Sequence, residues 1–296
     1  MAKARQIVKR RKAVTNIRKI TKTMQLIATA RFQSAYKRAT ATKPYTQKIT
    51  QLVEELAEAA EGQIDHPLMR ENPDARKDLL LVLSSNRGLC GGYNANVLRK
   101  SLAFLKERED RPRELHVVGK KGIIYFKFLG RAVDRPITSI DDRPRFDQVE
   151  PLATEYMQRY TAGEFGGVYV AYMRFLTTAR QVSEVLRLLP LSKDAQAPAG
   201  PAGPQAPRRT EVLYDFSPAP ADLLRVLLPQ TVKTRLFQCF TDAAVSEQLA
   251  RMVAMKAATD AGGDMIKLLS RQFNRARQTQ TTMELLDIVG GANALQ

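Results

Sequence analysis

Two long segments, one at each end of the chain, carry apolar residues at helical spacing. In the C-terminal segment these residues are Val232, Leu236, Cys239 and Ala243, followed by Ile266, Leu269, Phe273 and Ala276. Good helix formers dominate this segment, and no proline follows Pro229. A helix of about 60 residues is about 90 Å long, which is more than a domain of this size can bury. Such a helix needs a partner of similar length.

The N-terminal segment supplies that partner. One register places a run of apolar residues at heptad positions a and d, namely Ile7, Val14, Ile17, Met24, Ala28, Ala35, Ile49, Leu52, Leu56 and Ala59. Thr21, Arg31, Arg38 and Thr42 interrupt the run and reduce its apolar burial. We expect residues 1–61 and 217–296 to be helices that form a long antiparallel coiled coil. The pattern alone also allows two unrelated amphipathic helices that lie on a globular core.

Residues 62–216, between the two helices, alternate between strand and helix patterns. Short runs rich in apolar residues predict strands at 78–85, 114–119, 166–175, 181–191 and 211–216. Amphipathic helices are expected at 95–106 and 146–163, while 122–130 fits either a short helix or a strand. The alternation predicts an α/β domain with a largely parallel sheet. A stretch at 195–209, rich in Pro, Ala and Gly, is expected to be an exposed loop.

The distribution of charge along the chain limits the kinds of partner that the protein can bind. The formal net charge is +17, and residues 1–53 contain no Asp or Glu at all. One end of the coiled coil therefore carries a strong positive field, which implies a polyanionic partner such as nucleic acid, an anionic membrane or an acidic protein surface. A basic, acid-free start also resembles an organellar transit peptide. The heptad register runs unbroken from Ile7 past Leu56, which argues against a cleaved leader.

A glycine turn after the first predicted strand is the one place that invites a nucleotide. Gly88, Gly91 and Gly92 precede a helix, where backbone N–H groups could hold phosphate. Their spacing matches neither the dinucleotide-binding fingerprint nor the P-loop. We therefore interpret the three glycines as a structural turn, and an α/β enzyme that uses the turn ranks third among the functions considered.

Other chemistry has little support in the sequence. The chain has two histidines, His66 and His116, and two cysteines, Cys90 and Cys239, which lie far apart. Zinc binding and a Cys–His nucleophile are therefore not expected, and both cysteines should stay reduced in a cytosolic setting. No run of eighteen apolar residues predicts a membrane span. We expect no catalytic residue, cofactor or metal.

Four segments together resemble a known family. These are 18–31 (RKITKTMQLIATAR), 83–94 (LSSNRGLCGGYN), 246–263 (SEQLARMVAMKAATDAGG) and 273–295 (FNRARQTQTTMELLDIVGGANAL). They resemble the gamma subunit of the rotary F-type ATP synthase. The resemblance implies a coiled-coil shaft with a Rossmann-like domain at its foot, which rotates inside a ring of catalytic alpha and beta subunits. It further implies that the foot attaches to the membrane proteolipid ring and that the epsilon subunit binds the α/β domain.

The same resemblance implies roles for particular residues. Lys22, Thr23 and Met24 would lie near acidic lever loops of the beta subunits, and Arg277, Gln278, Thr282 and Glu284 would make polar contacts with beta loops. Ile288, Val289, Ala292, Ala294 and Leu295 would form the shaft tip in an apolar bearing. The family commonly has Ile and Gln where this chain has Thr281 and Met283. The chain also lacks the cysteine pair that confers thiol regulation on chloroplast members.

The resemblance implies a non-catalytic rotor subunit, peripheral to the cytoplasmic face of a bacterial inner membrane. It would couple ion-driven rotation of the proteolipid ring to ATP synthesis on the beta subunits. The alternative from composition is a basic coiled-coil protein that binds nucleic acid, since acid-free basic helices attract phosphate. Residues 1–50 offer only Phe32, Tyr36 and Tyr45 as aromatic side chains for stacking on bases.

Overall fold

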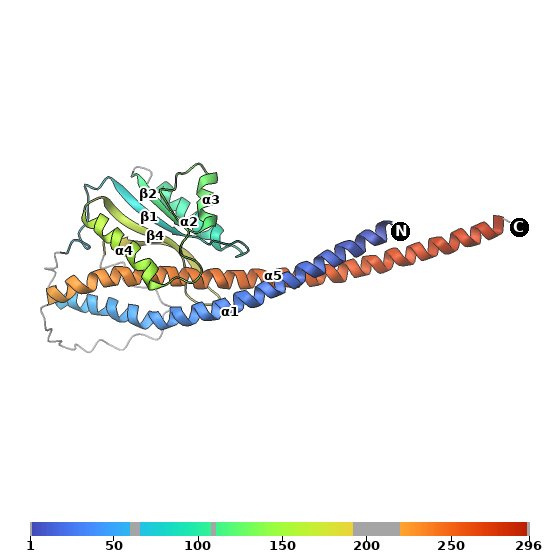
Figure 1. Cartoon of the computed structure of the whole chain (residues 1–296), viewed down its shortest axis with the longest axis horizontal. Helices are drawn as coiled ribbons and strands as arrows, with labels where there is room; N and C mark the ends of the chain where they lie inside the picture. The colour runs from blue at the N-terminus through green and yellow to red at the C-terminus, as the bar shows by residue number, and fades with distance from the viewer. Residues whose placement is uncertain (1, 60–65, 108–110, 192–219, 295–296) are drawn as a thin grey trace. The chain divides into compact units, whose positions relative to one another are not determined.

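The computed structural model describes residues 2–59, 66–107, 111–191 and 220–294. Helix α1 spans Ala2–Ala59 and helix α5 spans Pro220–Ala294, so the two predicted terminal helices are confirmed (Figure 1). The chain divides into two compact units. We call Met1–Ala30 with Arg251–Gln296 the coiled-coil unit, and Arg31–Ala250 the α/β unit.

Within the coiled-coil unit the two helices run antiparallel. The Thr259 hydroxyl donates to the Thr21 hydroxyl at 2.9 Å, and the Arg11 guanidinium lies 5.6 Å from the centre of the Phe273 ring. Gly262 faces Arg18, whose Cβ lies 3.3 Å from the position that a Cβ on the glycine would take. As the α1 number rises, the number of its α5 partner falls, which confirms the antiparallel pairing.

The side of α5 that faces this seam keeps a regular heptad. Its half-buried and buried residues alternate in steps of three and four, namely Met255, Thr259, Gly262, Ile266, Leu269, Phe273, Ala276 and Gln280. The predicted spacing of Ile266, Leu269, Phe273 and Ala276 is therefore confirmed. Figure 1 shows the last turns of α5 extending past the first turn of α1 within this unit.

On α1 the predicted d row is only partly correct, since Met24 and Leu52 are half-buried but Ile17 is not. Positions a, including Ile7, Val14 and Ala28, are half-buried or buried as expected. Ile17, assigned to position d, is 56% exposed. A further row lies one residue later along the helix, with Ala39 and Val53 buried and Arg11, Gln25 and Phe32 half-buried. Arg and Gln can cover a partner helix with their alkyl stems, but they leave no apolar signal in the sequence.

The α/β unit is built on one five-stranded sheet of order β3-β2-β1-β4-β5. The strands are β1 (Lys77–Leu83), β2 (Arg113–Val118), β3 (Arg135–Ile137), β4 (Phe165–Phe175) and β5 (Gln181–Leu189). All pairs are parallel except β4 with β5, so the largely parallel sheet is confirmed. The strand expected at 211–216 and the Pro/Ala/Gly-rich stretch at 195–209 lie outside the described residues.

Helices α2 (Tyr93–Glu107), α3 (Lys120–Phe128) and α4 (Phe146–Thr161) complete this unit, and α3 shows that 122–130 is largely helical. Strand β1 has side chains in two cores because both faces of the sheet are covered. Leu79, Leu81 and Leu83 join α4 and the first half of α5 in one core. Leu80 and Val82 join α2 and α3 in the other. The sequence run DLLLVL is continuously apolar for this reason.

The first half of α5 belongs to the α/β unit, where it packs as a core helix. Its apolar stripe, Val232, Leu236, Cys239 and Ala243, is buried against the sheet together with Leu224 and Leu228. The change of heptad phase between this stripe and the next therefore follows the change of environment along one helix. The first stripe packs on a sheet, and the second on a single helix.

Candidate functional site

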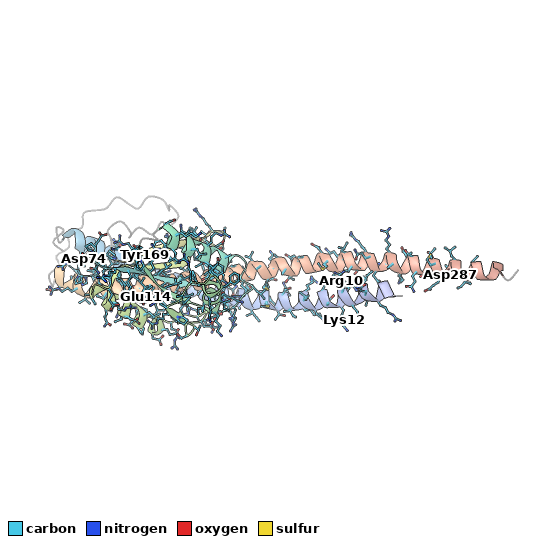
Figure 2. All side chains as sticks on the ribbon, turned by 90° about the horizontal axis from the view of Figure 1, so that it is seen from above. Arg10, Lys12, Asp74, Glu114, Tyr169 and Asp287 are labelled. Atoms are coloured by element: carbon cyan, nitrogen blue, oxygen red, sulfur yellow. The ribbon has the colours of Figure 1, made fainter. Side chains whose placement is uncertain are left out.

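The N-terminal half of α1 exposes basic side chains, with no acidic residue among them. Figure 2 shows Arg10 and Lys12 projecting from the helix, and the exposed basic residues of this stretch are Arg5, Lys9, Arg10, Lys12, Arg18, Lys19 and Lys22. Because no Asp or Glu occurs before Glu54, α1 itself offers no carboxylate there to neutralise them. This surface of the coiled-coil unit suits an acidic partner.

Lys22, Thr23 and Met24 occupy less than one turn of α1. Lys22 and Thr23 are exposed, whereas Met24 is half-buried beside the seam. The Thr23 hydroxyl donates to the backbone oxygen of Lys19 at 3.1 Å, and the Lys22 ammonium is 3.4 Å from the Gln25 amide oxygen. These contacts stay within the helix, so the Lys22 charge remains on the surface.

The polar set on α5 is equally exposed. Arg277, Gln278, Thr282 and Glu284 all lie on the surface. The Thr282 hydroxyl donates to the Gln278 backbone oxygen at 3.0 Å, and the Glu284 carboxylate accepts from the Gln280 amide at 2.8 Å. Each of these bonds joins residues one turn apart, so the side chains need no second element to hold them.

The structure does not bring the two polar sets together. Thr259 lies opposite Thr21, next to Lys22, while Gln278 is nineteen residues further along α5. At a rise of 1.5 Å per residue, the two sets are about 28 Å apart along the helix axis. They therefore form two separate levels on the coiled-coil unit, each able to meet a different segment of a surrounding partner.

The predicted shaft tip presents large apolar side chains to solvent. Ile288 is 68% exposed and Val289 is 55% exposed. Ala292 and Ala294 belong to the last turn of α5, and Leu295 lies outside the described residues. Leu285 and Leu286, which are not among the predicted tip residues, are 58% and 60% exposed. The run MELLDIV could have indicated these exposed residues, because a helix that is apolar on most sides needs burial in a partner.

In the glycine turn of the α/β unit, one glycine has a backbone conformation that other residues rarely adopt. Gly91 has φ +54°, in the left-handed region, whereas a Cβ on Gly88 or Gly92 would approach no atom closer than 3.5 Å. The Asn94 side chain closes the turn: its oxygen accepts from the Ser85 N–H at 3.0 Å, and its amide donates to the Ser85 hydroxyl at 2.8 Å.

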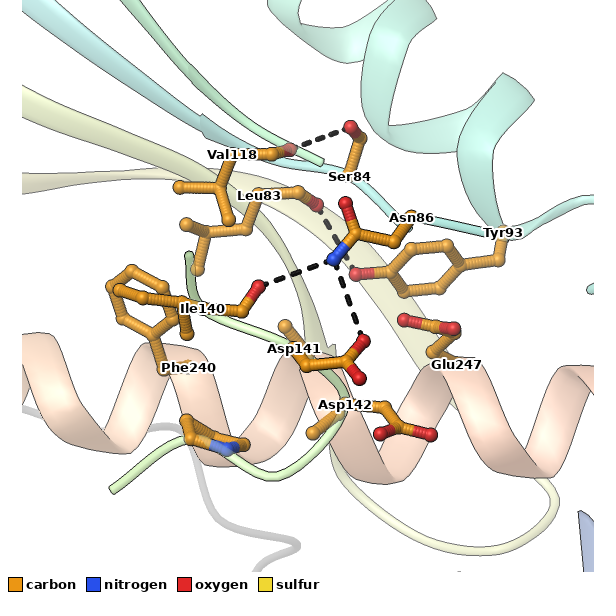
Figure 3. Close-up of a pocket in the computed structure, with 13 residues that line it drawn as sticks. Leu83, Ser84, Asn86, Tyr93, Val118, Ile140, Asp141, Asp142, Phe240 and Glu247 are labelled. Atoms are coloured by element: carbon orange, nitrogen blue, oxygen red, sulfur yellow. Dashed lines mark hydrogen bonds between the residues drawn. The ribbon is translucent and has the colours of Figure 1, made fainter. Parts of the chain in front are cut away.

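A small cavity lies beside this turn. Figure 3 shows Tyr93 and Asn86 pointing into it, with the Tyr93 hydroxyl donating to the Leu83 backbone oxygen at 3.1 Å and the Asn86 amide donating to the Ile140 oxygen at 3.3 Å. Phe240 of α5 also lines the cavity, whose volume is about 30 Å³. A cavity of this size holds about one water molecule. The interpretation of the three glycines as a structural turn stays a prediction.

Comparison with known proteins decides the family. Residues 3–295 match the family model described as ATP synthase. The chain is 43% identical over 298 residues to the ATP synthase gamma chain of Rhodopirellula baltica, and 38% identical over 297 residues to that of Leptospira biflexa. Both alignments cover 100% of this chain and 100% of the relative. This chain belongs to the ATP synthase gamma chain family.

A solved structure has the same fold as this gamma chain family member. It is a chain from the mitochondrial ATP synthase of Euglena gracilis, described as OSCP/F1/c-ring in rotational state 3. The match has a TM-score of 0.68 and covers 99% of this chain and 95% of the other, at 19% sequence identity. The fold predicted from the resemblance, an antiparallel coiled coil with an inserted Rossmann-like α/β domain, is confirmed.

One polar cluster in this gamma chain was not predicted from the sequence. The Glu114 carboxylate accepts two bonds from Arg159 at 2.8 Å, one from Lys77 at 2.7 Å, and lies 2.9 Å from His116 Nε2. The other ring nitrogen of His116 is 2.8 Å from the Tyr156 hydroxyl. The hydrogen bonds from Arg159, with those from Lys77 and His116, lower the pKa of Glu114 to about 2.

This cluster has a structural role in the α/β unit. Burial of His116 lowers its pKa although Glu114 opposes the shift, so the imidazole is neutral at pH 7. A neutral imidazole that donates to Glu114 accepts from Tyr156, which pins β2 to α4. The cluster was missed because its members come from three elements that are far apart in sequence.

Among the described residues, no group of three or more His, Cys, Asp or Glu is placed to hold a metal ion. In the same part of the chain, no helix combines the length and the apolar character that crossing a bilayer requires. The comparisons give no support to the nucleic-acid-binding alternative.

Proposed function

We propose that this chain is the central rotor shaft of an F-type ATP synthase. The observation that supports this most is the full-length match to ATP synthase gamma chains, on a fold whose coiled-coil unit carries exposed polar and apolar levels. A shaft inside a ring of partners needs surface side chains that are satisfied only in the complex. The chain itself would carry no catalytic step, and ATP would be made or hydrolysed on the beta subunits.

The two polar levels would couple rotation to the partners. Arg277, Gln278 and Glu284 can form oriented, charge-assisted hydrogen bonds whose strength changes with the rotational angle. Lys22 lies on a basic surface that attracts acidic loops. A partner ring with three different conformations would therefore favour particular angles at these levels, so that torque applied to the shaft changes the partners in sequence.

The apolar tip would serve as a bearing. Ile288 and Val289, with Leu285 and Leu286, offer apolar contacts, which have no directional preference. Ala292, Ala294 and Leu295 would continue the same surface. A hydrophobic sleeve around this end could hold the helix on axis while permitting rotation.

The remaining parts of the proposal follow from family membership. The partners would be the alpha and beta subunits, the epsilon subunit and the proteolipid ring, and the chain would be peripheral to the cytoplasmic face of a bacterial inner membrane. The division into 1–61, 62–216 and 217–296 would correspond to the N-terminal shaft helix, the Rossmann-like domain and the C-terminal shaft helix.

Reconstitution tests the proposal directly. The pure chain should hydrolyse no ATP, but it should stimulate hydrolysis when mixed with alpha and beta subunits. In single-molecule rotation, Arg277→Ala or Gln278→Ala should change the rate and the dwell angles, with Arg275→Ala, on an exposed neighbour, as the matched control. Truncation after Gly290 should lower complex stability and leave some coupled rotation. Turnover by the pure chain, or no stimulation of the alpha–beta complex, would overturn the proposal.

A further inference from the structure

One carboxylate of the α/β unit holds both long helices. The Asp142 side chain forms an ion pair with Arg31 of α1, and the same carboxylate oxygen accepts from the Gln248 amide of α5 at 3.1 Å. Figure 3 shows Asp142 lying against the α5 ribbon. The α/β unit begins at Arg31 and ends at Ala250, so Asp142 binds each helix at the level where this unit ends.

The loop that carries Asp142 is itself fixed to the sheet. It joins β3 to α4, and Ile140 in this loop is buried in the core that includes Leu83 of β1. The Asn86 amide, which follows β1, donates to the Ile140 backbone oxygen and lies 3.4 Å from an Asp141 carboxylate oxygen. The Asn86 oxygen accepts from the backbone N–H at the start of α3 at 3.1 Å. Asp142 therefore holds the helices from a support that is fixed at β1 and α3.

Helix α1 also touches the end of β4 through aromatic rings. The centre of the Phe175 ring lies 5.8 Å from that of Tyr36 and 6.5 Å from that of Phe32. Apolar contacts keep elements together but permit sliding, because the hydrophobic effect has no direction. A charge-assisted hydrogen bond needs a short distance and a good angle, and Asp142 is 13% exposed, so water competes little for its bonds. The bonds of Asp142 therefore resist twisting more than the ring contacts do.

We propose that Asp142 is a positioning residue for rotation, which locks the α1 and α5 segments of the α/β unit to its sheet. A torque applied to the sheet then reaches both helices with little twist. Without these bonds the helices stay covalently connected, but they can turn relative to the sheet before the torque is passed on. The proposal rests on the proposed function, because only a rotating shaft transmits torque.

Three variants and one control separate the contributions. Asp142→Ala removes both bonds, and Arg31→Gln removes only the charge on α1. The swap Arg31→Asp with Asp142→Arg restores opposite charges. The Gln248 side-chain oxygen can accept from the new guanidinium, since it is buried without a hydrogen-bond partner in the described part of the chain. The control, Asp147→Ala, breaks an Arg–Asp pair of 2.9 Å with Arg145 that lies exposed at the start of α4.

Hydrogen exchange reports whether the bonds hold α1. The measurement uses the full chain assembled with the alpha and beta subunits. In Asp142→Ala, the α1 amides around Arg31 should exchange roughly tenfold faster, because hydrogen bonds to charged groups oppose local opening. The swap should return exchange toward the wild-type rate, and Asp147→Ala should leave it unchanged.

Single-molecule rotation reports whether the bonds position the helices for torque. The catalytic ring is immobilised, a bead is attached to the α/β unit, and the angular width of the bead is measured within each dwell. Asp142→Ala and Arg31→Gln should widen this distribution beyond the scatter among wild-type particles, whereas the swap and Asp147→Ala should match the wild type. A residue that only stabilises the fold would lower the thermal midpoint without changing the width at a temperature where the chain is folded.

The outcomes separate this proposal from the proposed function. If the complex rotates and Asp142→Ala keeps the wild-type width, the Asp142 proposal is wrong and the rotor function stands, even where exchange is faster. If Asp142→Ala does not assemble, Asp142→Asn, which keeps the acceptor oxygen and loses the charge, takes its place, and a wild-type width in that variant overturns the proposal. If the wild-type chain does not rotate in the complex, the rotor function fails and this proposal fails with it.

Discussion

The two units of this chain are stabilised in different ways. In the α/β unit, side chains on both faces of the sheet reach complete burial, including Leu80, Leu81 and Val168 at 0% exposed. In the coiled-coil unit, the best-buried large aliphatic side chains are Met255 at 5% and Leu269 at 7% exposed. The α/β unit therefore contains its own hydrophobic core, whereas the coiled-coil unit depends on a narrow seam.

The seam of the coiled-coil unit is also chemically weak. It includes a hydroxyl pair, Thr21 with Thr259, and a glycine, Gly262, opposite the stem of Arg18. Small and polar seam residues permit close approach of the helices but bury less apolar area than Leu or Ile. We therefore predict that the α/β unit can remain folded alone, while the coiled-coil unit gains stability from a surrounding partner.

The largest expected effect comes from truncating a buried side chain, and it should differ between the two units. Leu81→Ala should lower the free energy of unfolding of the α/β unit by about 3 kcal/mol, because it leaves a cavity in a closely packed core. Leu269→Ala, in the seam, should lower that of the coiled-coil unit by about 2 kcal/mol, at the low end for such a truncation, since the site is narrow and borders solvent. Urea unfolding combined with hydrogen exchange measures both. Equal losses would show that the units share one core.

A second substitution tests close packing beneath α3. Gly122→Ala should destabilise the α/β unit by about 1 to 3 kcal/mol, because the new Cβ would lie 2.5 Å from the Ser84 hydroxyl and 2.8 Å from Val117 Cγ1. Gly92→Ala is the matched control, since its Cβ would come no closer than 3.5 Å to Asn96. Thermal unfolding compares the pair. A stable Gly122→Ala variant would mean that α3 can move away from β1.

The acid stability of the α/β unit should depend on Glu114. Because the folded state lowers its pKa to about 2 from its ordinary value of about 4.5, Glu114 contributes stability above the unfolded pKa. That contribution should be lost as the pH falls from about 4.5 toward about 2. Glu114→Gln should lower the free energy of unfolding at pH 7 and flatten its dependence on pH in this window. Unchanged slopes in urea titrations from pH 2 to 5 would contradict the assignment.

The smallest expected effect lies in the seam. Arg11→Gln should reduce the stability of the coiled-coil unit by about 0.5 to 1 kcal/mol, because the guanidinium no longer lies over the Phe273 ring. Lys12→Gln, an exposed neighbour, removes the same charge without that contact. Hydrogen exchange of the α5 amides around Phe273 should report the difference. Identical exchange in both variants would exclude the ring contact as a source of stability.

Sequence analysis predicted most of the fold because the fold follows apolar periodicity. The run DLLLVL predicted a strand covered on both faces, and Leu79 to Leu83 are indeed buried between two cores. The stripe from Val232 to Ala243 predicted a buried helix face for the same reason. Strands β4 and β5 also followed from two adjacent runs rich in β-branched and aromatic residues, although their antiparallel pairing was not predicted.

The features that the sequence did not predict depend on side chains whose contacts do not follow from their hydropathy. Arg11 and Gln25 are half-buried on α1, but polar side chains add nothing to an apolar pattern in the sequence. The Glu114 cluster joins β1, β2 and α4. No residue spacing in the sequence predicts the contact between Glu114 and Arg159. Likewise Phe128 resembles a core residue in sequence, and only the packing of Phe126 and Gly122 places it outside.

The acid-free surface of α1 also affects how this protein behaves at the bench. Exposed cations such as Arg10 and Lys12 displace condensed counterions from any polyphosphate, so cellular RNA and DNA should accompany the chain through purification in dilute buffer. The complex should dissociate steeply as salt rises, with no preference among base sequences. A gel-shift or an absorbance excess at low ionic strength would therefore report the counterion atmosphere and not a biological ligand.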